Sequence, residues 1–515
     1  MTDAAESQDE VFAFLGDPAT YGGLAVKRID THAASVFLAG ERALKIKRAV
    51  RFAFLDYSTL EKRKAACEAE LAVNRPFAPE IYLRVVAITR GADGTLALDG
   101  KGEPIEWAVE MRRFDDGALL SDLADEKRID AALADALGRV VAESHAKAPI
   151  VDPAPWLAAV PRYIESNDAE LRERPELFPP AEVEARTQAS RAAWTRVRPM
   201  LEERGRKGLI RRGHGDLHLG NIVLIDGKPV LFDAIEFSPV IASGDVLYDL
   251  AFLLMDLVER SLGAVANIVL NRYLTETHRI EDLDALAALP LFLTLRAAIR
   301  AKVTAARLPH AAPADALRIA QAARAYFDLA RRLISPPSPR LVAVGGLSGT
   351  GKSVLARMLA PDLGAAPGAV LLRSDVERKA MLGVPETEPL PAAGYAPDVT
   401  AKVYATLATK ADRVIAAGHS AVVDAVFARP DERDAIADIA AKRGIAFTGL
   451  FLTADLDTRI ARVTGRAHDA SDADAKIARM QEDYDVGPLD GWHSIDASGT
   501  PAETLARAKA EPGSR

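Results

Sequence analysis

Apolar and polar residues alternate in several short stretches near the beginning of the chain. These stretches lie at 34–38, 43–46 and 85–88. Alternation of this kind predicts β-strands with one buried face, because successive side chains of a strand point to opposite sides. A helical pattern interrupts the strands at 58–74. The sequence therefore predicts a small β-rich lobe with one helix over residues 1–115.

The pattern becomes mostly helical over residues 116–334, apart from short strand-like runs at 222–224 and 230–232. This stretch predicts a larger α-rich lobe. Three prolines then fall within residues 335–340. Because proline ends helices and favours an extended connector, we place a linker and a domain boundary there.

Four apolar runs alternate with helical stretches after the linker. They lie at 341–344, 370–372, 421–423 and 449–452. This rhythm indicates right-handed βαβ units and a parallel sheet covered by helices. The predicted fold class is multidomain: an α+β bilobal domain, then a C-terminal α/β domain with a parallel sheet over residues 341–515.

Length and composition narrow the class of protein. A chain of 515 residues is too long for a single hydrophobic core, and its 49% hydrophobic and 27% charged residues are typical of a soluble globular protein. A formal net charge of -8 disfavours nonspecific binding to nucleic acid or anionic membranes. Cys67 is the only cysteine, which excludes an internal disulfide.

Targeting signals are not evident in the sequence. The first six residues are acidic and lack the basic-then-apolar order of a secretory signal. The most apolar stretch, 246–258, contains Asp249 and Asp256, so it falls short of the ~20 apolar residues that a membrane span needs. We expect a cytoplasmic protein with no membrane partner.

The first candidate site is the stretch 214–221, which reads HGDLHLGN. Asp216 can accept or orient the proton of an attacking hydroxyl, and Asn221 can bind a metal ion. Their five-residue spacing lets one tight loop deliver both groups to one reaction centre. Asp233 follows a strand-like run and is placed to supply a second magnesium ligand.

This region resembles the aminoglycoside phosphotransferase and choline kinase branch of the protein-kinase-like superfamily, over roughly residues 20 to 330. The shared elements are the loop 214–221, FDAIE at 232–236, Asp245, and YDLA at 248–251. The resemblance implies a bilobal kinase fold in which Asp216 is the catalytic base and Asn221 and Asp233 are metal ligands. It implies a supporting structural role for Asp245 or Asp249.

The same resemblance implies a lysine that holds the α- and β-phosphates of ATP. Lys45 matches this position, and Lys47, on the same face of the strand, is the alternative. Glu70 is the expected ion-pair partner of the lysine, with Glu68 as a less favoured choice. Residues 110–112 would precede the segment that contacts adenine. The chain departs from kinases in lacking a Gly-x-Gly-x-x-Gly loop, and THAAS at 31–35 occupies that turn.

Other interpretations of this first site stay open. Asp216 and Asn221 could merely cap local turns, as aspartate and asparagine often do. The domain could also keep a kinase-like fold without activity.

The second candidate site is GLSGTGKS at 346–353, a P-loop that follows the apolar run 341–344. Its glycines let successive backbone N–H groups converge on phosphate oxygens, and a helix N-terminus adds its positive end. Lys352 would reach the β- and γ-phosphates, and Ser353 would ligate magnesium. The expected nucleotide-binding residues are Gly346, Ser348, Gly349, Thr350, Gly351, Lys352 and Ser353.

Two further carboxylates follow strands of the parallel sheet. Asp375 follows the second strand and Asp424 ends another, so both should lie at the carboxyl edge, where open α/β sheets bind ligands. They are candidates for a base and a metal-site carboxylate, although either could be an ordinary helix cap. Arg462 and Arg466 could clamp a transferring phosphoryl group or simply face solvent.

The region 340–500 resembles the small P-loop kinases, which include polynucleotide kinase, gluconate kinase, zeta toxin and chloramphenicol phosphotransferase. The P-loop, Asp375 with Arg378, and a lid-like stretch at 462–473 carry this resemblance. It implies that Asp375 activates the acceptor hydroxyl and that Arg378 helps to bind the acceptor.

The two sites together predict a bifunctional phosphotransferase that uses ATP and Mg²⁺ and acts on hydroxyl groups of small molecules. Asp115, Asp116 and Glu236 are candidate carboxylates for a polycationic acceptor. Two alternatives are a single P-loop kinase with a regulatory or substrate-binding first domain, and a nucleotide sensor that transfers nothing. The acidic chain disfavours a nucleic-acid end as acceptor. The acceptors and the oligomeric state stay open.

Overall fold

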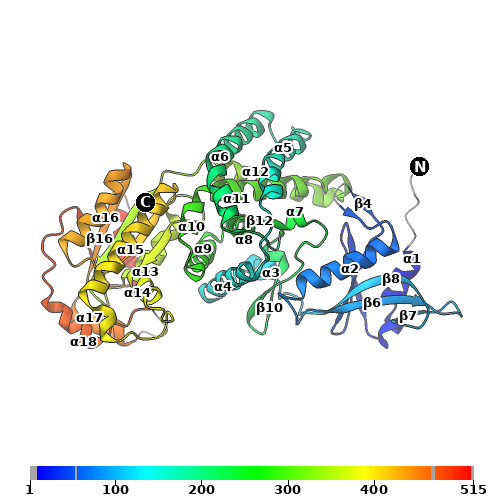
Figure 1. The fold of residues 1–515 in the computed structure, drawn as a ribbon, viewed down its shortest axis with the longest axis horizontal. Coiled ribbons are helices and arrows are strands. Elements are labelled where there is room, and N and C mark those ends of the chain that lie inside the picture. Colours follow the sequence, from blue (N-terminus) through cyan, green and yellow to red (C-terminus); the bar gives the residue numbers. More distant parts are fainter. Residues whose placement is uncertain (1–7, 53–54, 466–469, 512–515) are drawn as a thin grey trace. The chain divides into compact units, whose positions relative to one another are not determined.

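The structure is a computed structural model that describes residues 8–52, 55–465 and 470–511. The chain divides into two compact units (Figure 1). The first combines Met1–Tyr163 with Leu201–Arg260, and the second combines Ile164–Met200 with Ser261–Arg515. The domain boundaries predicted from the sequence, at 115 and 335–340, stay predictions beside this division.

The first unit begins with an antiparallel sheet in the order β1-β2-β3-β8-β6-β7. Its strands are β1 (Val26–Asp30), β2 (Ala34–Ala39), β3 (Arg42–Lys47), β6 (Tyr82–Arg90), β7 (Leu96–Leu98) and β8 (Glu103–Arg112). A hairpin of β4 (Arg51–Phe52) and β5 (Leu55–Asp56) precedes helix α2 (Leu60–Asn74). The predicted β-rich lobe is therefore present, and the helix expected at 58–74 is α2.

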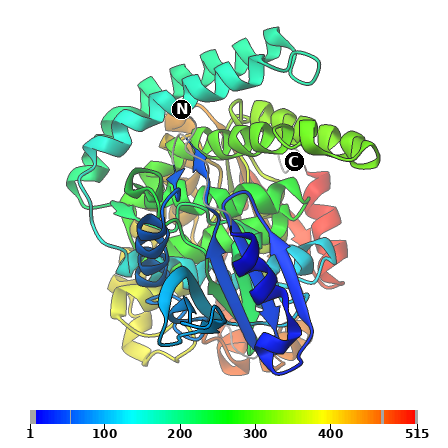
Figure 2. The ribbon, with the colours of Figure 1, turned by 90° about the vertical axis from the view of Figure 1, so that its right-hand side faces the viewer.

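This lobe also contains a second helix, α1 (Asp9–Gly16), followed by the 3₁₀ turn η1 (Pro18–Tyr21). The sequence analysis expected only one helix and was wrong on this point. Val11 and Leu15, one helical turn apart, are buried against one face of the sheet. Cys67 of α2 belongs to the apolar core on the opposite face. Figure 2 shows α1, in the darkest blue, against the strands.

The remainder of the first unit carries the catalytic-loop region on short elements. These are α3 (Leu120–Asp125), α4 (Ala131–Lys147), β9 (Ile210–Arg212), η2 (Leu219–Asn221), β10 (Ile222–Ile225), β11 (Lys228–Leu231), α7 (Pro239–Ala242), β12 (Ser243–Asp245) and α8 (Val246–Glu259). Strands β10 and β11 confirm the two predicted strand-like runs. Strands β9 and β12 form a three-residue antiparallel pair that the sequence analysis missed. The apolar stretch at 246–258 is the almost fully buried helix α8.

Further helices precede the parallel sheet in the sequence. Their bounds are α5 (Ala154–Arg172), α6 (Pro180–Arg206), α9 (Gly263–Thr277), α10 (Ile280–Ala285), η3 (Leu286–Ala288), α11 (Leu289–Ala305), η4 (Leu308–His310) and α12 (Pro313–Leu333). No helix of the described ranges is long and apolar enough to cross a membrane.

The parallel sheet of the second unit has the order β14-β15-β13-β16-β17. Its strands are β13 (Arg340–Gly346), β14 (Val370–Arg373), β15 (Ala421–Asp424), β16 (Ala446–Thr453) and β17 (Trp492–Asp496). The first four confirm the predicted strands. The sequence analysis missed β17, an edge strand whose sequence, WHSID, lacks a continuous apolar run.

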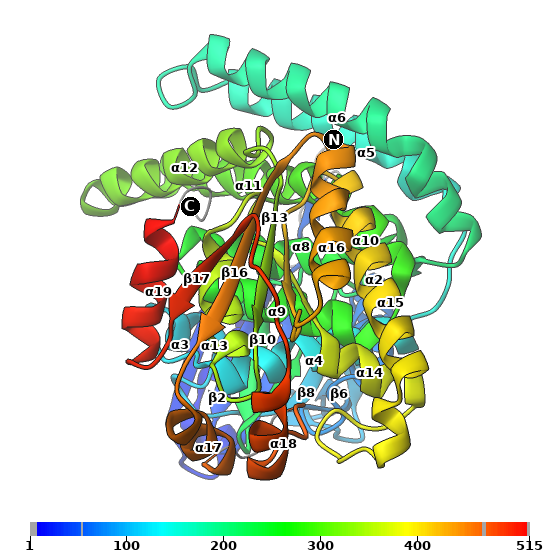
Figure 3. The ribbon, with the colours of Figure 1, turned by 90° about the vertical axis from the view of Figure 1, so that its left-hand side faces the viewer.

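Helices cover both faces of this sheet (Figure 3). Their bounds are α13 (Lys352–Leu359), η5 (Ala360–Asp362), α14 (Ser374–Leu382), η6 (Ala392–Tyr395), α15 (Pro397–Ala416), α16 (Pro430–Arg443), α17 (Leu456–Thr464), α18 (Ala475–Met480), η7 (Gln481–Asp483) and α19 (Pro501–Ala510). Helices α13 and α19 pack together on one face, while α15 and α16 pack on the other. The P-loop thus joins the central strand β13 to α13, with β15 ending beside it.

Candidate active sites

The loop that carries Asp216 follows strand β9 and is shaped by a carboxylate of helix α8. Asp249 accepts hydrogen bonds from the backbone N–H groups of His214 (2.8 Å) and Gly215 (2.9 Å). Gly215 has φ +81°, and a Cβ there would lie 2.9 Å from the Cα of Ala242, so only glycine fits without strain. Asp249 therefore supports the loop directly.

Asp245, the other support considered from the sequence, has a different task. Its buried carboxylate accepts hydrogen bonds from Arg204, at 2.6 and 2.9 Å. It also caps helix α8 by accepting a hydrogen bond from the backbone N–H of Leu247 at 2.9 Å. Asp245 thus anchors the helix that presents Asp249.

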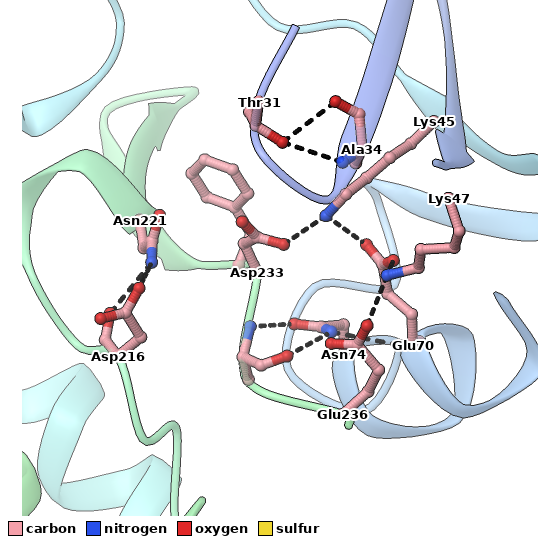
Figure 4. A network of polar contacts seen from close by, with 12 residues as sticks. Thr31, Ala34, Lys45, Lys47, Glu70, Asn74, Asp216, Asn221, Asp233 and Glu236 are labelled. Atoms are coloured by element: carbon pink, nitrogen blue, oxygen red, sulfur yellow. Dashed lines mark hydrogen bonds and ion pairs between the residues drawn. The ribbon is translucent and has the colours of Figure 1, made fainter. Parts of the chain in front are cut away.

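Asp216 and Asn221 lie side by side (Figure 4). The Asn221 amide donates to the backbone oxygen of Asp216 (3.0 Å) and to its carboxylate (3.1 Å). His218 Nε2 lies 3.4 Å from the same carboxylate. The Asp216 side chain is 40% exposed, so its carboxylate is open to a ligand. The spacing read from the sequence does bring these two groups to one point.

Asp233 sits just after strand β11 in the left-handed region, at φ +61°. Its backbone N–H donates to the Tyr82 hydroxyl at 3.0 Å. Asn74, at the end of α2, holds the next residue, Ala234, through both atoms of its amide. These contacts fix the turn that aims the Asp233 carboxylate at Lys45 Nζ, 2.5 Å away (Figure 4).

Both lysines of strand β3 reach the buried carboxylate of Glu70. Lys45 Nζ lies 2.8 Å from Oε1, and Lys47 Nζ lies 2.5 Å from Oε2. Burial disfavours the Lys45 ammonium, yet Asp233 and Glu70 hold the pKa of Lys45 well above its ordinary value. Burial likewise opposes the Glu70 carboxylate, and the two lysines nevertheless lower its pKa to about 2. Lys45, Lys47 and Glu70 are therefore charged at neutral pH.

Lys45, Lys47 and Asp233 border one cavity of about 610 Å³. The polar residues lining it include Lys45, Lys47, Asp115, Asp116, Asp216, Asn221, Asp233 and Glu236. Apolar residues Val36, Leu38, Met111 and Phe114 line it as well, and its size is in the range of nucleotide and small-molecule pockets. The Thr31 side chain closes the turn at 31–35 with two 3.0 Å hydrogen bonds to Ala34, where kinases use glycines.

The second cavity, of about 1250 Å³, surrounds the P-loop. Gly346, Gly349 and Gly351 all have positive φ, and a Cβ on Gly349 would lie 2.5 Å from the backbone oxygen of Arg459. Lys352 begins helix α13 and donates to the Leu347 carbonyl at 3.1 Å. The loop therefore has the backbone of a phosphate cradle, with a helix N-terminus behind it.

Ser353 and Asp424 meet at the carboxyl edge of the sheet. Ser353 Oγ donates to Asp424 Oδ2 at 2.5 Å. Arg373, which lies beside Asp424 in the register of β14 and β15, contacts both side chains at 3.2 and 3.3 Å. The sequence analysis did not single out Arg373. The available signal was its position at the end of a strand, one residue before the Ser374-Asp375 turn.

Asp375 and Arg378 both line the P-loop cavity. Burial and the nearby Asp424 raise the pKa of Asp375. Arg378 donates to the Gly394 carbonyl (2.9 Å) and lies over the Tyr395 ring, 4.8 Å from its centroid. Its buried Nε has no hydrogen-bond partner among the described residues. Arg378 is therefore held against the wall of this cavity by Gly394 and Tyr395.

Arg462 is the one of the two candidate clamp arginines that lies within the described residues. Arg462 donates to the carbonyl oxygens of Thr350 (3.4 Å) and Gly499 (2.7 Å), so it contacts the backbone of the P-loop. Arg466 lies outside the described residues, as does part of the lid-like stretch at 462–473.

Arg459 is a P-loop contact that the sequence analysis missed. It is buried on helix α17 and donates to the backbone oxygens of Ser348 (2.9 Å) and Ala478 (3.0 Å). Gln481 accepts a hydrogen bond from the Ser348 N–H at 2.7 Å. The spacing of three between Arg459 and Arg462 places both on one face of the helix, which was the available signal.

The oxygen ligands present fit a small hard cation at either site. Asn221 and Asp233 offer an amide and a carboxylate in the first cavity, and Ser353 and Asp424 offer a hydroxyl and a carboxylate in the second. Neither site has the three or more His, Cys, Asp or Glu side chains of an all-protein metal site, and no such cluster occurs within 8–52, 55–465 and 470–511. Such sparse sets suit Mg²⁺, which usually completes its shell with phosphate oxygens and water.

Comparison with known proteins assigns both domains. The model of the phosphotransferase enzyme family matches residues 41–289, and a model described as an AAA domain matches residues 341–486. The uncharacterized protein Rv2004c of Mycobacterium tuberculosis (strain ATCC 25618 / H37Rv) is 31% identical over 493 residues, which cover 93% of this chain and 94% of the relative. Uncharacterized protein Mb2027c of Mycobacterium bovis gives the same values.

Solved structures are also similar to parts of this chain. A choline/ethanolamine kinase family protein from Mesorhizobium loti is 16% identical and covers 64% of this chain and 98% of its own, with a TM-score of 0.37. A gluconokinase from Sinorhizobium meliloti 1021 is 19% identical, and the match covers 33% of this chain and 90% of the gluconokinase, with a TM-score of 0.25. The family resemblances predicted from the sequence are confirmed by the two family models. The chain belongs to the same family as the mycobacterial proteins, and it is a kinase in which a phosphotransferase-family domain precedes a P-loop domain.

Proposed function

We propose that each domain transfers the γ-phosphoryl group of ATP to a hydroxyl group of a small molecule. The observation that carries the proposal is the grouping of Asp216, Asn221, Asp233 and Lys45 around one cavity, with a complete P-loop in a second cavity. Two family models of phosphotransferase and P-loop type support it.

In the first domain, Asp216 accepts the proton of the acceptor hydroxyl as the oxygen attacks the γ-phosphorus. The bond between that phosphorus and the bridging oxygen of ADP breaks, so ADP leaves. Lys45 holds the α- and β-phosphates, and Asn221 and Asp233 hold Mg²⁺. The metal, when bound, neutralises charge on the phosphates and orients them.

In the second domain, the backbone N–H groups of the P-loop and Lys352 hold the phosphates, while Ser353 and Asp424 hold the metal. Asp375 takes the proton of the acceptor hydroxyl, and its raised pKa makes it a stronger base than an ordinary aspartate. Arg378 binds an oxygen atom of the acceptor through its buried guanidinium.

Transfer of label from γ-labelled ATP into a bacterial small-metabolite extract tests the proposal. The wild-type chain should produce labelled compounds that a double variant, Asp216→Asn with Lys352→Ala, does not. If the wild type binds Mg²⁺–ATP but labels no more material than the double variant, the chain is a nucleotide sensor and the proposal is wrong.

A further inference from the structure

Lys47 is a second buried lysine in the first site. Its side chain is 4% exposed, and it lies two residues after Lys45 on the same face of β3. Its ammonium contacts Glu70 Oε2 at 2.5 Å and also pairs with Glu236 (Figure 4). A buried ammonium group without anionic partners would be strongly unfavourable. The ion pairs with Glu70 and Glu236 are therefore what allow Lys47 to be buried.

The Glu70 carboxylate forms ion pairs with two lysine ammonium groups. Lys45 contacts one oxygen and Lys47 the other, and the Glu70 side chain is completely buried. Lys45 has a second anionic partner in Asp233. A Lys45 that also contacts the phosphates of a nucleotide can neutralise Glu70 only in part, and Lys47 supplies the second counter-charge. Without Lys47, the buried Glu70 carboxylate would be incompletely compensated.

Glu236 extends the network to the segment that carries Asp233. It lies three residues after Asp233 and accepts a hydrogen bond from the Tyr57 hydroxyl at 2.8 Å. Lys47 therefore joins strand β3, helix α2 and the segment 232–237 through two ion pairs. Asn74 provides an uncharged link between α2 and the same segment.

We propose that Lys47 is a positioning residue that neutralises Glu70 together with Lys45 and holds the Asp233 segment in place for the metal. This inference rests on the function proposed for the first domain. Lys47 contacts neither the phosphates nor the metal, and it acts through Glu70 and Glu236. Its loss should weaken nucleotide binding because Lys45 is then the sole counter-charge of Glu70 and Glu236 loses its ion pair.

The test measures binding of a nonhydrolysable ATP analogue in the presence of Mg²⁺, in a full-length Lys352→Ala background that silences the P-loop site. Adding Lys47→Met should weaken binding at least about tenfold and raise the Mg²⁺ concentration needed for half-saturation, as expected for breaking a buried charge pair. Lys47→Arg, which keeps the charge, should recover most of the affinity. Lys101→Met, an exposed position in the same lobe, is the matched control and should change nothing.

If Lys47→Met does not fold, Glu236→Gln is the second variant to test, because it removes one ion pair of Lys47 and leaves the Lys47–Glu70 pair intact. It should raise the Mg²⁺ requirement by severalfold. Unchanged Mg²⁺ and analogue binding in a folded Lys47→Met or Glu236→Gln variant would overturn the inference. If wild type binds the analogue at this site but forms no Asp216-dependent product, only the proposed function fails, because the binding test of Lys47 still decides the inference.

Discussion

Ser353 and Asp424 share a 2.5 Å hydrogen bond that joins the end of the P-loop to the carboxyl end of strand β15. Both oxygens face the cavity where the metal of the second site is proposed to bind. Asp424→Asn should therefore raise the Mg²⁺ concentration for half-maximal formation of the Lys352-dependent product by about tenfold or more. Asp362→Asn, an exposed carboxylate of the same domain, should leave it unchanged.

Gly349 has no room for a side chain. It has φ +86°, and an added Cβ would lie 2.5 Å from the Arg459 carbonyl, whereas a Cβ on Gly351 would meet only the end of Arg462, at 4.0 Å. Gly349→Ala should therefore reduce nucleotide binding at the P-loop more than Gly351→Ala, which suffers backbone strain alone. Binding of a nonhydrolysable ATP analogue in a Lys45→Met background, which removes the phosphate-holding lysine of the first site, measures both. Equal losses would show that the contact with Arg459 does not matter.

Asp249 holds the catalytic loop through two backbone N–H groups. Asparagine in its place keeps one acceptor oxygen but turns its NH₂ group toward one of the two backbone N–H donors. This unpaired contact should destabilise the loop by about 1–3 kcal/mol. Asp249→Asn should lower kcat for the Asp216-dependent product strongly while the Lys352-dependent product persists. Asp226→Asn, in the exposed turn between β10 and β11, is a control of the same chemistry. Normal kcat in Asp249→Asn would contradict the role of Asp249.

His419 should make the second unit sensitive to acid. Its ring donates to the Gly368 carbonyl at 2.7 Å, and burial lowers the pKa of His419 to about 4 from 6.5. Above pH 6.5 the ring is neutral in both states and adds no pH dependence. Between pH 6.5 and about 4 only the unfolded state binds the proton. Protonation of His419 should therefore lower the free energy of unfolding by ~1.4 kcal/mol for each unit by which the pH is lowered.

Urea unfolding of the full chain at several pH values checks this slope, because other groups titrate equally in wild type and variant. His419→Gln should flatten the dependence between pH 6.5 and about 4. His493→Gln, a half-exposed histidine paired with Glu511, should not. Identical slopes for wild type and His419→Gln would refute the prediction.

Local motifs explain why much of both sites was predictable. Asp216 with Asn221, and Gly346 to Ser353, are each set by short spacing within one loop, so the sequence itself carries the geometry. The Lys45–Glu70 ion pair was also expected, because the resemblance to protein-kinase-like enzymes implied it. The four apolar strands of the parallel sheet were visible because burial on both faces demands continuous apolar runs.

Contacts between distant segments were not predictable in the same way. Lys47 and Glu236 are 189 positions apart, and only the folded lobe brings them together. Arg459 looks like an ordinary helix arginine until its contact with Ser348, 111 positions away, is known. Helix α1 and strand β17 are short, which gives each little periodicity to detect, and their burial is set by packing against the rest of each domain.

The most direct test of two independent kinase sites separates the labelled products formed by Asp216→Asn and by Lys352→Ala from γ-labelled ATP and a small-metabolite extract. We predict that each variant loses a different labelled product and keeps the other. If Asp216→Asn keeps every product that wild type forms while Lys352→Ala loses all of them, the first domain is not a kinase site and the proposed bifunctional activity is wrong.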